Sequence, residues 1–86
     1  MEGAVMNERI YMLCDLEVDE KGRVTDIFTR GDMRRRFMDL GLIGGTEVTC
    51  LLKTHKGDIS AYLVRGTVIA IRSEDVREIF IKKLRE

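Results

Sequence analysis

The sequence predicts a mainly β fold, a small partly open barrel of five to six strands with one α-helix and a short helical turn. Short stretches of alternating apolar and polar residues recur between tight turns, which is typical of strands. Only residues 32–40 show convincing helical spacing. Closure of the strands into a barrel is expected because it removes exposed sheet edges from so short a chain.

Length and charge limit what the chain can be. Its 86 residues suffice for one domain with one modest core. We expect residues 1–12 to be a loose lead-in and residues 13–86 to form the domain. The 15 basic and 15 acidic residues balance, whereas a nucleic-acid binder usually carries a basic excess, so no nucleic-acid partner is expected. No signal peptide or membrane-spanning apolar run is visible, which predicts a cytoplasmic protein.

Two strands joined by a turn are predicted at the start of the domain. From Leu13 to residue 18, apolar and acidic residues alternate. Residues 23–28 are rich in β-branched and aromatic side chains. Between them, residues 19–22 have the composition of a turn, in which Gly22 is free to adopt a positive φ.

The predicted helix carries an apolar stripe. Met33, Phe37 and Leu40 recur at i, i+4 and i+7, which places them on one helical face. Such a stripe is either part of the core or a partner-binding surface, and the need to bury one face in so small a domain favours the core.

Both ends of this helix have recognisable signals. Asp32 is a suitable N-cap residue. Gly41 occupies the position where a left-handed residue often ends a helix, and the apolar Leu42 after it fits a Schellman-type ending.

The second half of the chain is predicted to consist of strands and tight turns. Val48, Cys50 and Leu52 alternate with more polar residues and are expected to share one face. Ser73 is expected to cap a short helical turn, and Ile79 and Ile81 are expected to point inward from the last strand. The predicted strands cover residues 47–53, 59–64, 68–72 and 78–82.

Four motifs occur in order in this sequence. Arg36 to Thr46 resembles the pattern R-L-x-x-L-G-L-x-P-G-T, and the Gly57-Asp58 turn comes next. Gly66 to Arg72 resembles G-x-x-I-A-L-R, and Ser73 to Ile81 resembles E-A-x-x-I-x-V. Together, over about residues 13–82, they resemble the FeoA family.

Three positions depart from the pattern of that family. Gly44 stands where the family usually has proline, and Ile59 stands where proline is common. Asp19 occupies a position often filled by glycine, and aspartate tolerates left-handed backbone geometry better than most residues. These departures concern loops and leave the predicted core unchanged.

The resemblance implies an SH3-like barrel that acts by binding a partner. The resemblance also implies a cytosolic accessory component of bacterial ferrous iron uptake. The implied partner is the cytosolic, GTPase-bearing region of the FeoB transporter. The alternative is a regulatory module similar to the C-terminal barrel of DtxR-type metal-dependent repressors, acting on transcription. Membrane contact would come only through the partner, and edge strands with zero net charge permit weak self-association.

The partner-binding surface is expected on the helix and on the turn after it. An exposed apolar residue beside arginines suits a contact surface, and glycine backbone can approach a partner closely. The alternative for the run Arg34 to Arg36 is an ordinary solvated helix face. The residues predicted for partner binding are Arg35, Arg36, Met38, Leu42, Ile43, Gly44 and Gly45.

Neither a resident cofactor nor catalysis is predicted. No serine or cysteine has a histidine at motif spacing, and no glycine-rich loop resembles a phosphate-binding loop. His55 and Asp58 are near neighbours in one loop and are weak candidate ligands for Fe²⁺. The alternative is an exposed hairpin loop, because Cys50 and Cys14 alternate with core residues and leave too few ligands.

Overall fold

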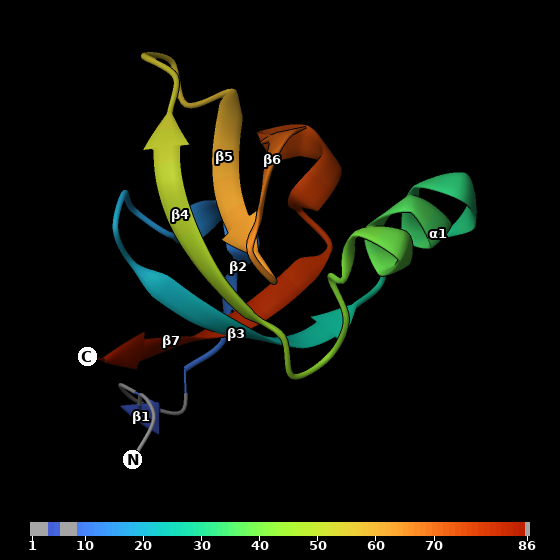
Figure 1. Ribbon diagram of the computed structural model, residues 1–86, viewed down its shortest axis with the longest axis horizontal. Helices are drawn as coiled ribbons and strands as arrows, with labels where there is room; N and C mark the ends of the chain where they lie inside the picture. Colours follow the sequence, from blue (N-terminus) through green and yellow to red (C-terminus); the bar gives the residue numbers. More distant parts are fainter. Residues whose placement is uncertain (1–3, 6–8, 86) are drawn as a thin grey trace.

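One antiparallel sheet, curled into a partly open barrel, makes up most of the molecule (Figure 1). The computed structural model describes residues 4–5 and 9–85. The sheet, α1 (Gly31–Leu40) and the short helical turn at residues 73–76 confirm the predicted mainly β fold with one α-helix and a short helical turn. In chain order the elements are β1 (Ala4–Val5), β2 (Tyr11–Met12), η1 (Leu13–Asp15), β3 (Lys21–Ile27), α1 (Gly31–Leu40), β4 (Glu47–Lys53), β5 (Ile59–Val64), β6 (Thr67–Arg72), η2 (Ser73–Val76) and β7 (Ile79–Arg85).

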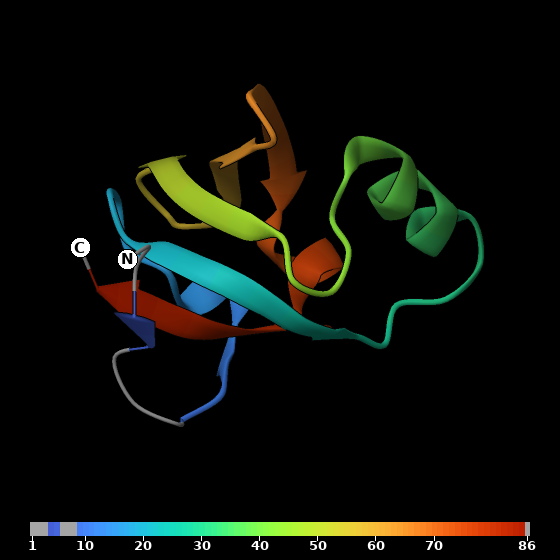
Figure 2. The same ribbon diagram turned by 60° about the horizontal axis from the view of Figure 1, so that its bottom comes forward.

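The sheet has the strand order β1-β7-β3-β4-β5-β6, and β2 also pairs with β7. Ala4 pairs with Arg85, so β1 and the end of β7 lie together on the side of the barrel away from α1 (Figure 2). The other end of the sheet is β6, and α1 stands beside it (Figure 1). The barrel is thus open at the edge of β6 that faces the helix.

The core fills the interior of the barrel and continues under α1. Met33 and Leu40 are half-buried and pack against this core, so the helical stripe is a core face as predicted. Ile79 and Ile81 point inward, also as predicted. The buried apolar side chains are Leu13, Leu16, Val24, Phe37, Leu42, Val48, Cys50, Tyr62, Val64, Ile69, Ile71, Val76, Ile79 and Ile81.

Helix α1 ends as the sequence predicts but begins differently. Gly41 has a φ of 94°, and the Leu42 N–H donates to the Phe37 carbonyl oxygen over 2.9 Å, which is the Schellman arrangement. The prediction of Asp32 as N-cap is wrong. The helix begins at Gly31 after an extended Arg30, so Asp32 lies in the first turn. There its negative charge interacts favourably with the positive end of the helix dipole.

The first predicted strand is wrong as well. Leu13–Asp15 form the 3-10 turn η1, in which the Leu16 N–H donates to the Leu13 carbonyl and the Asp15 carboxylate accepts from the Met12 N–H. Leu13 and Leu16 are both buried, so this turn buries apolar side chains that the sequence pattern had placed in a strand. Strands β1 and β2 lie within the predicted lead-in and pair with β7, while the domain boundary at residue 13 stays a prediction.

Gly22 has a different role from the one predicted. It lies within β3 without a positive φ, and a Cβ atom there would come 2.6 Å from Cδ1 of the buried Ile81. The Ile81 side chain packed against the β3 backbone, rather than turn geometry, favours glycine at this position. The left-handed residue of the turn is Asp19, with a φ of 74°.

Two predictions for the second half fail for reasons of tertiary structure. Leu52 is 61% exposed, because a bulge between Cys50 and Leu52 reverses the alternation of β4. Ser73 does not cap η2. Its hydroxyl donates instead to the Gly57 carbonyl over 2.6 Å and ties η2 to the β4–β5 loop.

Tyr62 makes the stability of the fold sensitive to alkaline pH. Its side chain is fully buried, and burial raises the pKa of the phenol from 10.0 to about 12. The unfolded chain loses this proton first, so the stabilisation is complete below pH 10.0 and is lost as pH rises through about 12.

We therefore expect the free energy of unfolding to fall with pH in this window, with the Tyr62→Phe variant lacking that contribution. Denaturant unfolding of both proteins at a series of alkaline pH values measures the difference. An identical pH dependence of the two proteins contradicts the prediction.

Candidate functional site

The segment between α1 and β4 is held firmly against β3. The Gly45 N–H donates to the Val24 carbonyl over 2.8 Å, and the Val24 N–H donates to the Thr46 carbonyl over 2.9 Å. The Thr46 hydroxyl donates to the carbonyl of Gly41 over 2.8 Å. These bonds present the turn to solvent in one conformation.

Residues Ile43 to Thr46 form a type II turn. The Thr46 N–H donates to the Ile43 carbonyl over 3.0 Å, and Gly45 has a φ of 91° while Gly44 does not have a positive φ. A type II turn requires a positive φ at its third residue and favours proline at its second. Gly45 meets the first requirement, and Gly44 stands at the position that proline prefers.

This turn, the last turn of α1 and the β5–β6 turn together form a surface that we call the loop surface. We define it by Met38, Ile43, Gly44, Gly45 and Arg65. Met38 is 50% exposed and Ile43 is 39% exposed, so the loop surface presents apolar side chains to solvent. Apolar side chains beside a cation and uncovered backbone are features of protein contact surfaces.

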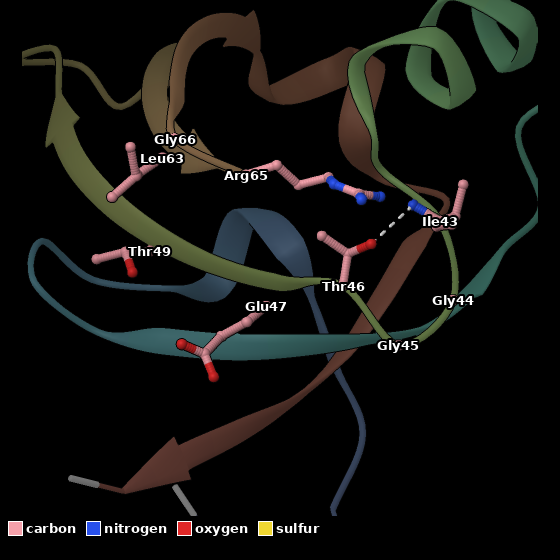
Figure 3. Close-up of a pocket in the computed structure, with 9 residues that line it drawn as sticks. All are labelled: Ile43, Gly44, Gly45, Thr46, Glu47, Thr49, Leu63, Arg65 and Gly66. Carbon is pink, nitrogen blue, oxygen red and sulfur yellow. Dashed lines mark hydrogen bonds between the residues drawn. The ribbon is translucent and has the colours of Figure 1, made fainter. Parts of the chain in front are cut away.

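Two depressions flank Ile43 and Gly44. One, of about 570 Å³, lies between this turn and the start of β4 on one side and Leu63 and the Arg65-Gly66 turn on the other (Figure 3). The second depression, of about 320 Å³, is lined in part by Met38 and Arg34. The loop surface is therefore an exposed ridge between two hollows.

Arg65 joins the two turns and was not predicted. Its side chain reaches toward the Ile43 side of the larger pocket (Figure 3). It also lies over Gly41, where a Cβ atom would come 2.5 Å from the Arg65 Cδ. Nothing local in the sequence signals this contact, because it depends on the barrel bringing β5 and β6 to the end of α1.

The predicted partner-binding residues do not all share one surface. Leu42 is fully buried, so its prediction as a contact residue is wrong: its side chain belongs to the core beneath the turn. Arg35 and Arg36 are exposed on α1, but Arg36 lines a separate groove facing β6. Met38, Ile43, Gly44 and Gly45 are the predicted residues that gather together.

Arg34 differs from its two neighbours. Its Nη1 donates to the Ile27 carbonyl over 2.8 Å and to the Thr29 carbonyl over 3.4 Å. It therefore ties α1 to the segment that enters it, whereas Arg35 and Arg36 are exposed to solvent and their role in partner binding stays a prediction.

Metal binding by His55 and Asp58 stays a prediction. Both His55 and Asp58 are exposed, and one Asp58 carboxylate oxygen accepts a hydrogen bond from the Thr54 hydroxyl over 2.6 Å. Across residues 4–5 and 9–85, no three His, Cys, Asp or Glu side chains are grouped to hold an ion. Burial raises the pKa of the Cys50 and Cys14 thiols, which disfavours the thiolate that binds metals.

Fold and surface together define a small SH3-like barrel with an exposed, partly apolar ridge and, in its described part, no helix long and apolar enough to cross a membrane. The chain belongs to the FeoA family, because the sequence model of the FeoA domain matches residues 11–83. No curated protein sequence matches the chain significantly.

Solved structures agree with this assignment. The chain is 29% identical to a FeoA-like protein from Clostridium acetobutylicum, with a TM-score of 0.81 over 93% of each chain. It shares 22% identity with FeoA of Stenotrophomonas maltophilia, solved with zinc and described as a prokaryotic SH3 domain protein and candidate ferrous iron transport activating factor. That match has a TM-score of 0.71 and covers 84% of this chain and 89% of the other.

The same fold occurs within a longer protein chain. IdeR of T. acidophilum is 23% identical to this chain, with a TM-score of 0.77 over 95% of this chain and 38% of IdeR. At this identity the likeness shows a shared fold, and it involves only part of the IdeR chain.

Replacing Gly44 by proline should stabilise the protein. Its N–H makes no backbone hydrogen bond among the described residues, and a Cβ there would be 3.8 Å from the nearest atom, the Thr25 carbonyl oxygen. Proline at the second position of a type II turn restricts the unfolded chain, which is worth about 0.4–1 kcal/mol. Denaturant unfolding measures this gain.

Gly45→Ala is the matched control, because its φ of 91° strains any residue with a Cβ. It should lower the free energy of unfolding by about 1 kcal/mol. If Gly44→Pro destabilises the protein as well, the type II assignment is wrong.

Proposed function

We propose that this protein is a non-catalytic cytoplasmic accessory component of ferrous iron uptake. In this proposal it binds the cytosolic, GTPase-bearing region of a FeoB transporter and modulates that region. Membership of the FeoA family supports the link to iron transport. The description of the Stenotrophomonas protein as a candidate transport activating factor points the same way.

The observation that carries this proposal is the loop surface. Met38 and Ile43 expose apolar side chains beside a hydrogen-bonded glycine turn that has little side-chain cover. A rigid turn loses little conformational entropy when a partner binds, so its apolar contacts contribute more of their free energy to affinity. The two flanking hollows give a partner side chain room to enter on either side of the ridge.

A charge on the apolar part of the loop surface should weaken partner binding. Met38→Glu places a carboxylate where the proposed interface excludes water, and we expect the affinity for the cytosolic region of the transporter to fall about tenfold or more. Titration calorimetry with the purified region, with and without guanine nucleotide, measures this change.

Val18→Glu is the matched control. Val18 is 45% exposed, similar to Met38, and it precedes the start of β3, whereas α1 follows the end of that strand. It should leave the affinity unchanged. Equal affinity of the wild type and a folded Met38→Glu variant removes Met38 from the interface, and a lack of binding by the wild type in any nucleotide state contradicts the proposed partner.

The fold that the chain shares with a manganese-dependent transcriptional repressor supports one alternative, a regulatory module that acts with a metal-dependent repressor. In that case this chain would bind the parts of a repressor that the repressor's C-terminal barrel normally contacts. Titrating this chain into such a repressor, and separately into the transporter region, discriminates the two functions. An adjacent transporter gene favours the first function, and an adjacent repressor gene favours the second.

A further inference from the structure

A second interaction surface lies between α1 and the open edge of the barrel. It is a groove of about 550 Å³ with the helix as one wall and β6 as the other. The loop surface lies outside it, since neither Met38 nor the Ile43–Thr46 turn lines it. The lining residues are Met33, Arg36, Phe37, Leu40, Ile69, Ala70, Ile71, Arg72 and Asp75.

The β6 wall is the edge of the strand rather than one of its faces. Ile69, Ala70, Ile71 and Arg72 are consecutive, and neighbouring residues of a strand point to opposite faces of the sheet. A cavity that touches all four must therefore run along the backbone edge. Strand β6 ends the sheet, and within residues 9–85 no backbone hydrogen bond joins it to α1 or to β7.

The α1 wall is an apolar stripe with one charge. Met33, Arg36, Phe37 and Leu40 have the spacing i, i+3, i+4 and i+7, so they form a continuous row along the groove. Phe37 is buried, whereas Met33 and Leu40 are only half-buried and have surface left to cover. The same stripe thus serves the core at its centre and offers apolar contacts along its length.

Charge at the groove is positive. Arg36 from α1 and Arg72 from the end of β6 are both exposed, and the acid that lines the groove is the half-buried Asp75. A segment with acidic side chains at its margins complements this pair of arginines.

We propose that this groove binds an extended, acidic segment of a partner protein as an added strand on β6. Unpaired backbone groups of the edge provide hydrogen bonds, and alternate apolar side chains of the segment contact Met33 and Leu40. The helix stands beside the edge, in the path of a second barrel that would pair edge to edge (Figure 1). A single strand needs only about 4.8 Å beside its neighbour, which favours a peptide over a second copy.

This inference does not depend on the identity of the partner named above, so it is tested with synthetic peptides. The probe is a short, end-blocked peptide in which leucine alternates with glutamate, titrated into the full chain and followed by amide NMR. We expect saturable shifts in residues 67–72 and along α1, with slower hydrogen exchange in β6. An otherwise identical peptide with lysine in place of glutamate should bind more weakly.

Backbone pairing is tested by methylating the peptide at alternate amide nitrogens, in two complementary sets. An added strand directs alternate N–H groups toward its neighbour. One set should therefore weaken binding about tenfold or more, while the other has little effect. Equal tolerance of both sets overturns the proposal.

Charge recognition is tested by Arg36→Glu and Arg72→Glu, each expected to weaken binding of the acidic peptide about fivefold. Arg35→Glu is the matched control, because Arg35 is exposed on the same helix but does not line the groove. No saturable shift with millimolar peptide overturns the proposal. Self-association of the free chain through β6, detected by light scattering and lost when Arg72 is replaced, also overturns it in favour of a second copy.

Discussion

The hydrogen bond from the Leu42 N–H to the Phe37 carbonyl is the interaction on which the two surfaces depend. It ends α1 at Gly41, and the buried side chains of both bonded residues anchor that end to the core. A residue with a Cβ at Gly41 would be strained by the φ of 94° and would collide with Arg65. Where the helix ends therefore determines where the turn of the loop surface begins, and the same helix forms one wall of the groove beside β6.

An accessory protein of this size has little room for separate binding and structural parts. The molecule solves this by giving single elements two roles. The row of side chains on α1 completes the core through Phe37 and lines a groove through Met33 and Leu40. The turn after α1 is tied to β3 by backbone hydrogen bonds, so it adds stability while it exposes Ile43.

Features that depend on local spacing could be predicted from the sequence, and those that depend on tertiary structure could not. The helical stripe and the left-handed Gly41 follow from spacing within a few residues, and both are confirmed. Leu52 was misplaced because a bulge shifts its strand, and Gly22 was misread because its close neighbour Ile81 lies far along the chain. In the candidate site, exposed Met38 and the glycine turn were predictable, whereas the contact of Arg65 with the helix end and the β6 groove required the assembled barrel.

In both proposals this barrel binds its partner through surfaces created where α1 meets the sheet. The most direct measurement is cross-saturation NMR of the labelled chain bound to the cytosolic region of the ferrous iron transporter of its own organism. We expect signal loss at Met38, at residues 43–45 and at Arg65, with further loss along β6 if the same partner supplies the added strand. Signal loss confined to residues 54–58 at the opposite end of β4, with the α1 end unaffected, would show that the partner binds elsewhere on the barrel.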